Sequence, residues 1–220
     1  MLHSQSLEEI ERSTFEVDNI LERARASDSD SERERLATQT LTMARSLRYD
    51  GGIIRSSMVL GEVCARSGRT EQALQYYLEA EAKIINTGNR AAQLAVQNAL
   101  GDLFFQEKLY VNARRYYREI LALQPNDYRI KEKMGDACLL DMRFDSAEYF
   151  YKELIIKYKE EGNNPRLVQI YQKLANAYDQ NGDPGKSLYY YLPIEDLVER
   201  FGTSPERGLL YNNLGRQYAA

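Results

Sequence analysis

A short pattern recurs along the chain and constrains its fold more than any other feature. At each copy an apolar residue is followed by glycine or alanine and, three positions after that small residue, by cysteine or an aromatic side chain. The small residues are Gly61, Gly101, Gly135, Ala175 and Gly215, at spacings of 40, 34, 40 and 40 residues. A fixed period of this length indicates one structural unit repeated along the chain.

A second pattern follows each of the first four copies. Twelve positions after the first small residue comes another small residue, and four positions later comes a tyrosine. These residues are Ala73, Ala113, Ala147 and Ser187, followed by Tyr77, Tyr117, Tyr151 and Tyr191. Steps of three and four residues place side chains on one face of a helix.

Together the two patterns predict a pair of antiparallel helices in every unit. Glycine or alanine on the first helix would face alanine or serine on the second, so that the two backbones approach closely. One such pair cannot bury its apolar stripe alone, and neighbouring pairs must therefore stack. We predict an all-α fold, a right-handed superhelical solenoid of antiparallel helix pairs.

The repeat boundaries follow from the spacing. The predicted units span about 54–93, 94–127, 128–167 and 168–207, and a half unit follows at 208–220. For residues 1–50 we predict a degenerate helical pair or a cap, with helices over 5–26 and 30–48. Because the half unit still resembles a regular repeat, we expect the natural chain to continue past Ala220. A capping helix, or another chain that covers this helix by self-association, remains the alternative.

Glycine and proline mark the expected helix ends. Gly88, Gly162 and Gly202 each stand 13 residues before the small residue of the next unit, where a glycine commonly closes a helix. Pro193 interrupts the helical run over 184–201. We predict a kink or a break there, because proline lacks the backbone N–H and its ring disturbs the preceding turn.

The residues of the unit over 94–127 resemble the tetratricopeptide repeat. This unit contains Leu-Gly-x-x-Phe, eight intervening residues, Ala-x-x-x-Tyr-x-x-Ile and then Pro125. The resemblance covers about 54–220, and its 40-residue spacing is similar to the repeats of kinesin light chains, Rap-type regulators and bacterial sensor-associated proteins. It implies a non-catalytic scaffold or adaptor that binds a protein or peptide segment on a concave face. The alternative that it implies is the regulatory segment of a longer signalling enzyme, such as a histidine kinase, cyclase or phosphatase.

Composition argues against several other classes of protein. The single histidine, His3, and the two cysteines, Cys64 and Cys138, cannot form a four-ligand zinc site, and we expect no cofactor and no enzyme activity. The net charge of -4 gives no overall attraction to nucleic acid. No run of about 18 apolar residues predicts a membrane helix, and the N-terminus does not resemble a signal peptide. We therefore expect a cytoplasmic protein with a protein or peptide partner, and the basic side chains described next favour an acidic one.

A candidate peptide-binding stripe follows from the side chains beside the small residues of the first helices. The basic and amide side chains among them are Arg129, Lys133, Lys173, Asn176, Asn213 and Arg216. Residues at i, i+3 and i, i+4 share a face of a helix, so these pairs could line one groove and bind carboxylates and backbone amides. A solvated charged face, balanced by Asp102 and Asp136, is the alternative interpretation.

Overall fold

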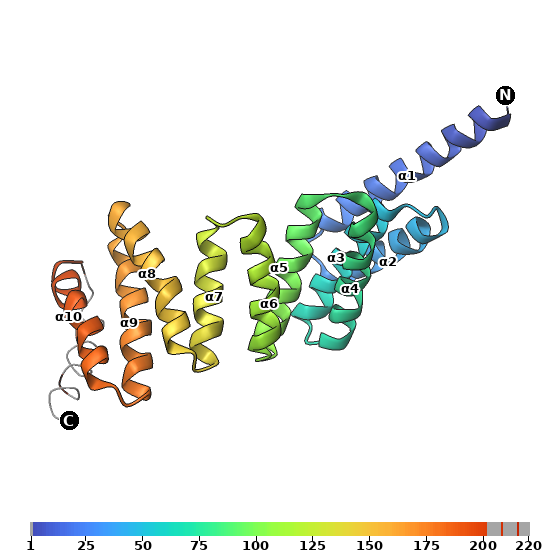
Figure 1. Ribbon diagram of the computed structural model, residues 1–220. Coiled ribbons are helices and arrows are strands. Elements are labelled where there is room, and N and C mark those ends of the chain that lie inside the picture. The colour runs from blue at the N-terminus through green and yellow to red at the C-terminus, as the bar shows by residue number, and fades with distance from the viewer. Residues whose placement is uncertain (1, 202–207, 209–214, 216–220) are drawn as a thin grey trace. The chain divides into compact units, whose positions relative to one another are not determined.

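The computed structural model describes residues 2–201 together with Gly208 and Gly215, and its described residues form ten α-helices and no strand (Figure 1). The helices are α1 Leu2–Ala26, α2 Asp30–Ser46, α3 Asp50–Arg66, α4 Thr70–Thr87, α5 Arg90–Gln106, α6 Tyr110–Leu123, α7 Tyr128–Leu140, α8 Phe144–Glu160, α9 Asn164–Gln180 and α10 Pro184–Phe201. The predicted fold class is therefore confirmed as an all-α solenoid of antiparallel helix pairs.

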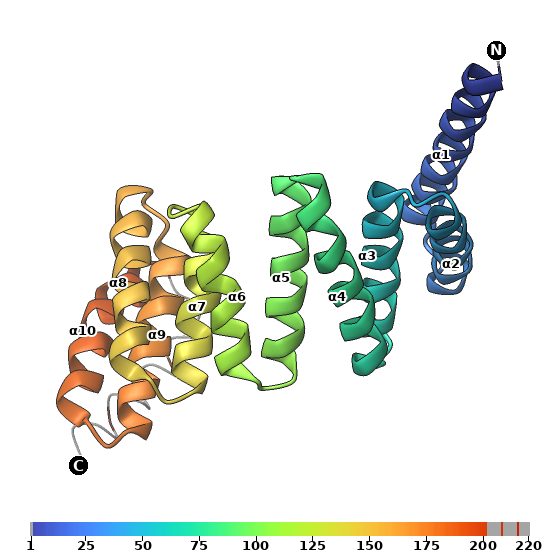
Figure 2. The same cartoon turned by 45° about the vertical axis from the view of Figure 1, so that its right-hand side comes forward.

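The chain divides into two compact units, which comprise residues 1–120 and 121–220. Within the first unit, α1 packs on α2, α2 on α3, α3 on α4 and α4 on α5. Within the second, α7 packs on α8, α8 on α9 and α9 on α10, as Figure 2 shows. The N-terminal pair formed by α1 and α2 lies close to its expected position, whereas the division into a segment 1–50 and an array 54–220 stays a prediction.

In the helix pairs α3–α4, α5–α6 and α7–α8 a tyrosine ring lies over the glycine of the first helix. A Cβ atom added to Gly61, Gly101 or Gly135 would come within 2.3, 2.6 and 2.7 Å, respectively, of the Cε1 atom of the tyrosine that follows 16 residues later. The nearest atoms to a Cβ on Gly101 belong to the Tyr117 ring, a contact that the spacing did not predict, while the facing of Ala113 toward Gly101 stays a prediction. The close approach of the helices still requires glycine, because the ring occupies the space that a side chain would need.

The second-helix residues are buried as the repeat predicts. Ala73, Ala113, Ala147 and Ser187 have no exposed surface, and Tyr77, Tyr117, Tyr151 and Tyr191 are at most 4% exposed. The fifth copy cannot be judged in the same way. Gly215 is exposed, but the residues around it lie outside the part of the chain that the structure describes.

Left-handed residues close the helices. Gly88 has φ 61° and Gly162 has φ 65°, as expected for glycines after a helix, while Gly202 lies outside the described residues. The turn between the two helices of a unit holds a further left-handed residue that we did not predict. This position is glycine in two units, Gly68 and Gly182, but Lys108 and Met142 take the same conformation in the other two.

Helix α10 is continuous through Pro193, so the predicted break does not occur, and the alternative of a kink stays a prediction. Pro193 is exposed, whereas Tyr190, Tyr191 and Ile194 around it are buried. We infer that the packing of these three side chains on α9 holds the helix together across the missing hydrogen bond. No described helix has both the length and the apolar character needed to cross a membrane.

Candidate functional site

The first helices of the second unit contain four of the six residues of the predicted peptide-binding stripe. Arg129 and Lys133 lie one turn apart on α7, and Lys173 and Asn176 lie one turn apart on α9. Asn213 and Arg216, the other two, lie outside the described residues.

Arg129 is the most accessible of these cations. Its side chain is 90% exposed, and its Nη2 atom lies 3.7 Å from Oδ2 of Asp127. Asp127 is itself the N-cap of α7, where its Oδ1 atom accepts hydrogen bonds from the backbone N–H groups of Arg129 and Ile130. A half-exposed ion pair of this length is weak, so the guanidinium can turn to bind another anion.

Lys173 connects the two first helices. From α9 its Nζ atom reaches α7, where it lies 2.6 Å from Oδ1 of Asp136 and 3.4 Å from Oε1 of Glu132. Arg166, also on α9, lies 3.5 Å from the same Glu132. The faces of α7 and α9 that the sequence assigns to the groove therefore do adjoin, but the cations on them alternate with carboxylates.

Tyrosine hydroxyls fix the residues that follow Gly101, Gly135 and Ala175 by hydrogen bonds. The Tyr117 hydroxyl donates to Asp102 over 2.8 Å, and the equivalent hydroxyls of Tyr151 and Tyr191 donate to Asp136 and Asn176. Each tyrosine stands 15 residues after its acceptor. The tyrosine that lies over the small residue therefore also orients the next side chain of the first helix.

The buried tyrosines show how strongly this arrangement is desolvated. Burial raises the pKa of Tyr151 far above its ordinary value, and the neighbouring carboxylate of Asp136 raises it further. Tyr151 thus remains a neutral hydrogen-bond donor. The repeat over 54–93 departs from this pattern. Its residue after Gly61 is Glu62, whose carboxylate lies 3.4 Å from Arg33 instead of beside a tyrosine hydroxyl.

This pairing of a tyrosine with a first-helix acceptor was not foreseen. The signal was present in the sequence as Asp, Asp and Asn at positions 102, 136 and 176, each immediately after a small residue. The spacing alone placed these residues on the groove face. The spacing did not show that the tyrosine ring lies over the glycine, or that the tyrosine hydroxyl lies beside the Asp or Asn side chain.

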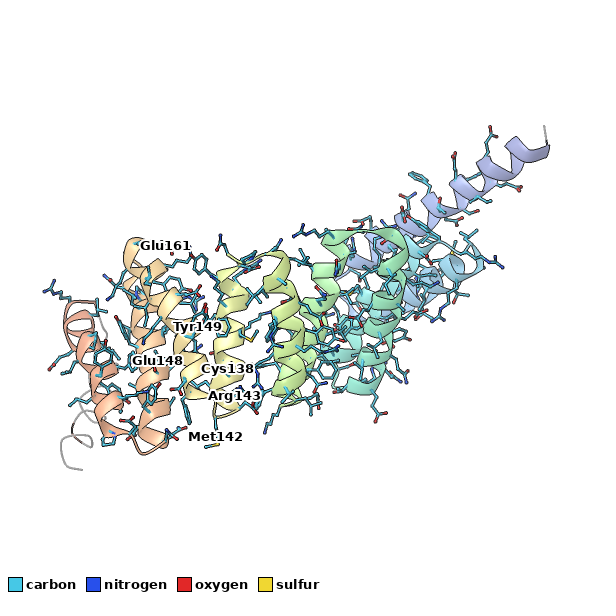
Figure 3. The ribbon with its side chains drawn as sticks, viewed as in Figure 1. Cys138, Met142, Arg143, Glu148, Tyr149 and Glu161 are labelled. Carbon is cyan, nitrogen blue, oxygen red and sulfur yellow. The ribbon has the colours of Figure 1, made fainter. Side chains whose placement is uncertain are left out.

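A second polar cluster centres on Glu148 of α8, which Figure 3 labels. Lys152 pairs with this carboxylate at 2.6 Å, and the hydroxyls of Tyr178 and Tyr190 both donate to it. Burial raises the pKa of Glu148, but these hydrogen bonds outweigh burial and lower it to about 2. Because Tyr178 lies on α9 and Tyr190 on α10, the cluster joins three helices and serves the packing of the second unit.

The described residues offer no site for a metal ion, since they contain no group of three or more metal-ligating His, Cys, Asp or Glu side chains. Cys64 and Cys138 are both buried free thiols. Burial raises the pKa of the Cys64 thiol, which makes it a poor nucleophile.

Comparison with known proteins finds one family model that matches part of the chain. Residues 98–165 match the family model described as tetratricopeptide repeat. No protein of curated function matches the sequence.

Several solved structures share the fold. MamA of AMB-1 is 20% identical with a TM-score of 0.63, and the match covers 90% of this chain and 97% of that one. A second structure is described as nearly identical TPR-like repeats of a putative kinesin light chain from Podosopora anserina. Its sequence is 14% identical to this chain, the TM-score is 0.69, and the match covers 86% of this chain and 98% of that one. MamA from Desulfovibrio magneticus RS-1 is 15% identical with a TM-score of 0.65, over 87% and 98%. At these identities the similarity establishes the fold alone.

Proposed function

We propose that the chain is a cytoplasmic, non-catalytic scaffold that binds a segment of another protein, and the match of residues 98–165 to the tetratricopeptide repeat model supports this proposal. The proposed binding surface is the groove face, which we define as the exposed side of α7 and α9 that carries Arg129, Lys133, Lys173 and Asn176. Asn213 and Arg216 would extend this face along the next first helix. In the described residues the proposal rests mainly on one observation, the reach of Lys173 from α9 to Asp136 on α7.

The reach of Lys173 matters because it joins two successive repeats into one polar surface. Asp136 is held by Tyr151 and Asn176 by Tyr191, so neither side chain has to be ordered when a ligand arrives. Side chains that are already fixed lose less conformational entropy on binding. An extended segment that follows this row would meet acceptors and donors at positions set by the protein itself.

The charged and amide side chains of the groove face differ in what they can contribute to binding such a segment. Arg129 is exposed at the start of α7, and Lys133 is half-buried one turn further along the same helix. Lys173 already pairs with two carboxylates, so its ammonium contributes less to anion binding than the sequence led us to expect. Because Arg129 is 90% exposed, we assign the main carboxylate contact of an acidic ligand to Arg129, with Lys133 beside it on the same face of α7, and the contacts with ligand backbone amides to Asn176.

The test is capture of a partner followed by its titration. The full chain is immobilised, proteins are captured from a lysate of the source organism, and the segment that binds is identified and titrated by calorimetry. The double variant Arg129→Glu/Lys133→Glu should lose at least about tenfold in affinity, because two attractive contacts become repulsive. Its matched control is Arg118→Glu/Lys159→Glu, which reverses two exposed cations on the second helices α6 and α8.

The two variants have the same net charge, which separates a local contact from a general electrostatic effect. Equal affinity of both variants for the segment would refute the groove face as the binding surface. Circular dichroism melting of both shows that the fold is kept. The regulatory alternative stays a prediction, and the reading frame downstream of residue 220 decides it, since a catalytic domain there would support regulation.

A further inference from the structure

A second recessed site lies in the first unit, on the seam where α4 packs against α5. It is a cavity of about 360 Å³ lined mainly by apolar side chains. Leu78, Ile84, Ile85 and Val96 form its apolar part, and Glu81 and Gln97 add polar groups. Two of these aliphatic side chains remain open to solvent, with Ile85 84% and Leu78 42% exposed. Exposed aliphatic groups beside a cavity are a common feature of binding sites.

Gln97 contributes a hydrogen-bond acceptor that the fold leaves unused. The residue is only 6% exposed, and its Nε2 atom donates to Oε2 of Glu119 over 2.9 Å. This bond distinguishes the nitrogen from the oxygen of the Gln97 amide, because a carboxylate can only accept a hydrogen bond and its partner must be the nitrogen. The Oε1 atom of Gln97 is consequently a buried acceptor, and it has no hydrogen-bond partner. A buried acceptor without a partner is costly and calls for an explanation.

The charge around the cavity is negative. Glu81 lines it, and the hydroxyl of Tyr116 lies 3.5 Å from Oε2 of Glu81. Burial raises the pKa of Glu81, and the nearby Glu119 raises it further. Arg115 is the neighbouring cation, and its Nη1 atom lies 4.0 Å from Oε1 of Glu119 while its guanidinium lies 4.3 Å from the centre of the Tyr116 ring. Two carboxylates thus share one guanidinium, and Glu81 has no salt bridge in the part of the chain described.

We propose that this cavity binds a segment of a partner protein in which an aliphatic side chain stands next to a lysine or an arginine. The aliphatic side chain would fill the space between Ile84, Ile85 and Val96. The adjoining cation would balance Glu81 and Glu119, and a backbone N–H of the segment would donate to Oε1 of Gln97. Oε1 of Gln97 is an acceptor and the carboxylates of Glu81 and Glu119 are anions, so the ligand that complements these three groups carries a donor and a cation.

This site is separate from the groove face. It lies in residues 78–119 and is formed by the second helix of one pair and the first helix of the next, whereas the groove face lies on α7 and α9. A scaffold with both sites could hold two segments of opposite charge at the same time. The inference does not require the groove face to be correct, because it rests on different residues.

Small peptide probes test the proposal on the full chain. Acetyl-Leu-Lys-amide carries both predicted features, acetyl-Leu-Glu-amide reverses the charge, and acetyl-Gly-Lys-amide lacks the aliphatic side chain. Binding is measured by saturation-transfer difference NMR and by calorimetry. We expect saturable binding of the Leu-Lys probe, and binding of the other two that is about tenfold weaker or absent.

Variants of the cavity show where the probe binds. Glu81→Gln and Gln97→Met should each weaken binding of the Leu-Lys probe several-fold. Glu71→Gln, an exposed carboxylate on the same helix α4, is the matched control and should leave it unchanged. Should Gln97→Met fail to fold, as melting would show, Glu81→Gln still decides the question because Glu81 is only half-buried.

Three results would overturn the proposal. These are no saturable binding of the Leu-Lys probe, equal binding of the Leu-Glu probe, or binding that neither cavity variant changes. Sedimentation of the full chain at increasing concentration supplies a fourth. A self-association that Glu81→Gln abolishes would identify a second copy as the occupant in place of a partner segment. Unchanged probe binding in Arg129→Glu/Lys133→Glu would confirm that the two sites are independent.

Discussion

Substitution of Gly101 by alanine tests the contact that brings the helices of a pair together. The new Cβ atom would lie 2.6 Å from Cε1 and 2.9 Å from Cδ1 of Tyr117. Carbon atoms in contact are about 3.5–4.0 Å apart, so the ring would have to move by about 1 Å. Tyr117 is only 1% exposed, and its hydroxyl is bonded to Asp102 over 2.8 Å, which restricts that movement.

Two opposing effects set the size of the change. Overpacking of a core costs about 1–3 kcal/mol. Alanine stabilises the interior of a helix by about 1 kcal/mol relative to glycine, which offsets part of that cost. We therefore expect Gly101→Ala to lower the free energy of unfolding by about 1 kcal/mol and by at most about 2 kcal/mol.

The assay is urea unfolding followed by circular dichroism. Gly185→Ala is the matched control, because Gly185 is also helical but an added Cβ would meet only Oδ1 of Asp183 at 3.6 Å. This control should gain up to about 1 kcal/mol. In a Tyr117→Leu background the ring is absent, and Gly101→Ala should then stop being destabilising. A stabilising Gly101→Ala in the original background would refute the proposed contact.

Two further predictions follow from the second unit. Met142 is left-handed at φ 56° and 72% exposed, so Met142→Gly should raise the free energy of unfolding. The expected gain is about 0.5–1 kcal/mol. Leu140→Gly at the end of α7 is the control and should lower the free energy of unfolding. A loss of stability in Met142→Gly would contradict the argument. The pKa of Glu148 is lowered from 4.5 to about 2, so its contribution to stability is complete above pH 4.5 and is lost as the pH falls toward 2. The free energy of unfolding of Glu148→Gln should accordingly vary less over this pH range, and an equal pH dependence would show that the carboxylate is not involved.

The sequence predicted the helices and the buried stripe of each repeat because both depend on periodicity. Ala73, Ala113, Ala147 and Ser187 were assigned to the interior from spacing alone, and all are fully buried. Spacing defines which face of a helix a residue occupies, but it does not define the direction of a long side chain. For that reason the spacing did not predict that the ring of Tyr117 fills the space beside Gly101.

The candidate site was predicted less completely. Arg129, Lys133, Lys173 and Asn176 do lie on first helices, as the repeat requires. The ion pairs of Lys173 were not predicted, because Glu132 stands outside the positions assigned to the groove and the position of Asp136 on the groove face does not show that Lys173 reaches it. Salt bridges between helices depend on side-chain reach across a packing interface, which a single helical pattern does not contain.

Other differences have a similar origin. Proline lowers the intrinsic stability of a helix, yet the packing of Tyr190, Tyr191 and Ile194 keeps α10 intact at Pro193. The repeat pattern does not predict the cavity beside Gln97. Its polar residues, Glu81 and Gln97, stand between the repeat positions and become neighbours only when α5 packs on α4.

Hydrogen exchange of the full chain with and without its captured segment tests the proposed binding surface most directly. The groove face predicts slower exchange of backbone amides in α7 and α9, over residues 128–140 and 164–180. The double variant Arg129→Glu/Lys133→Glu should show no such slowing at the same segment concentration. Slower exchange confined to α8 and α10, or an equal effect in the double variant, would contradict binding on the first helices.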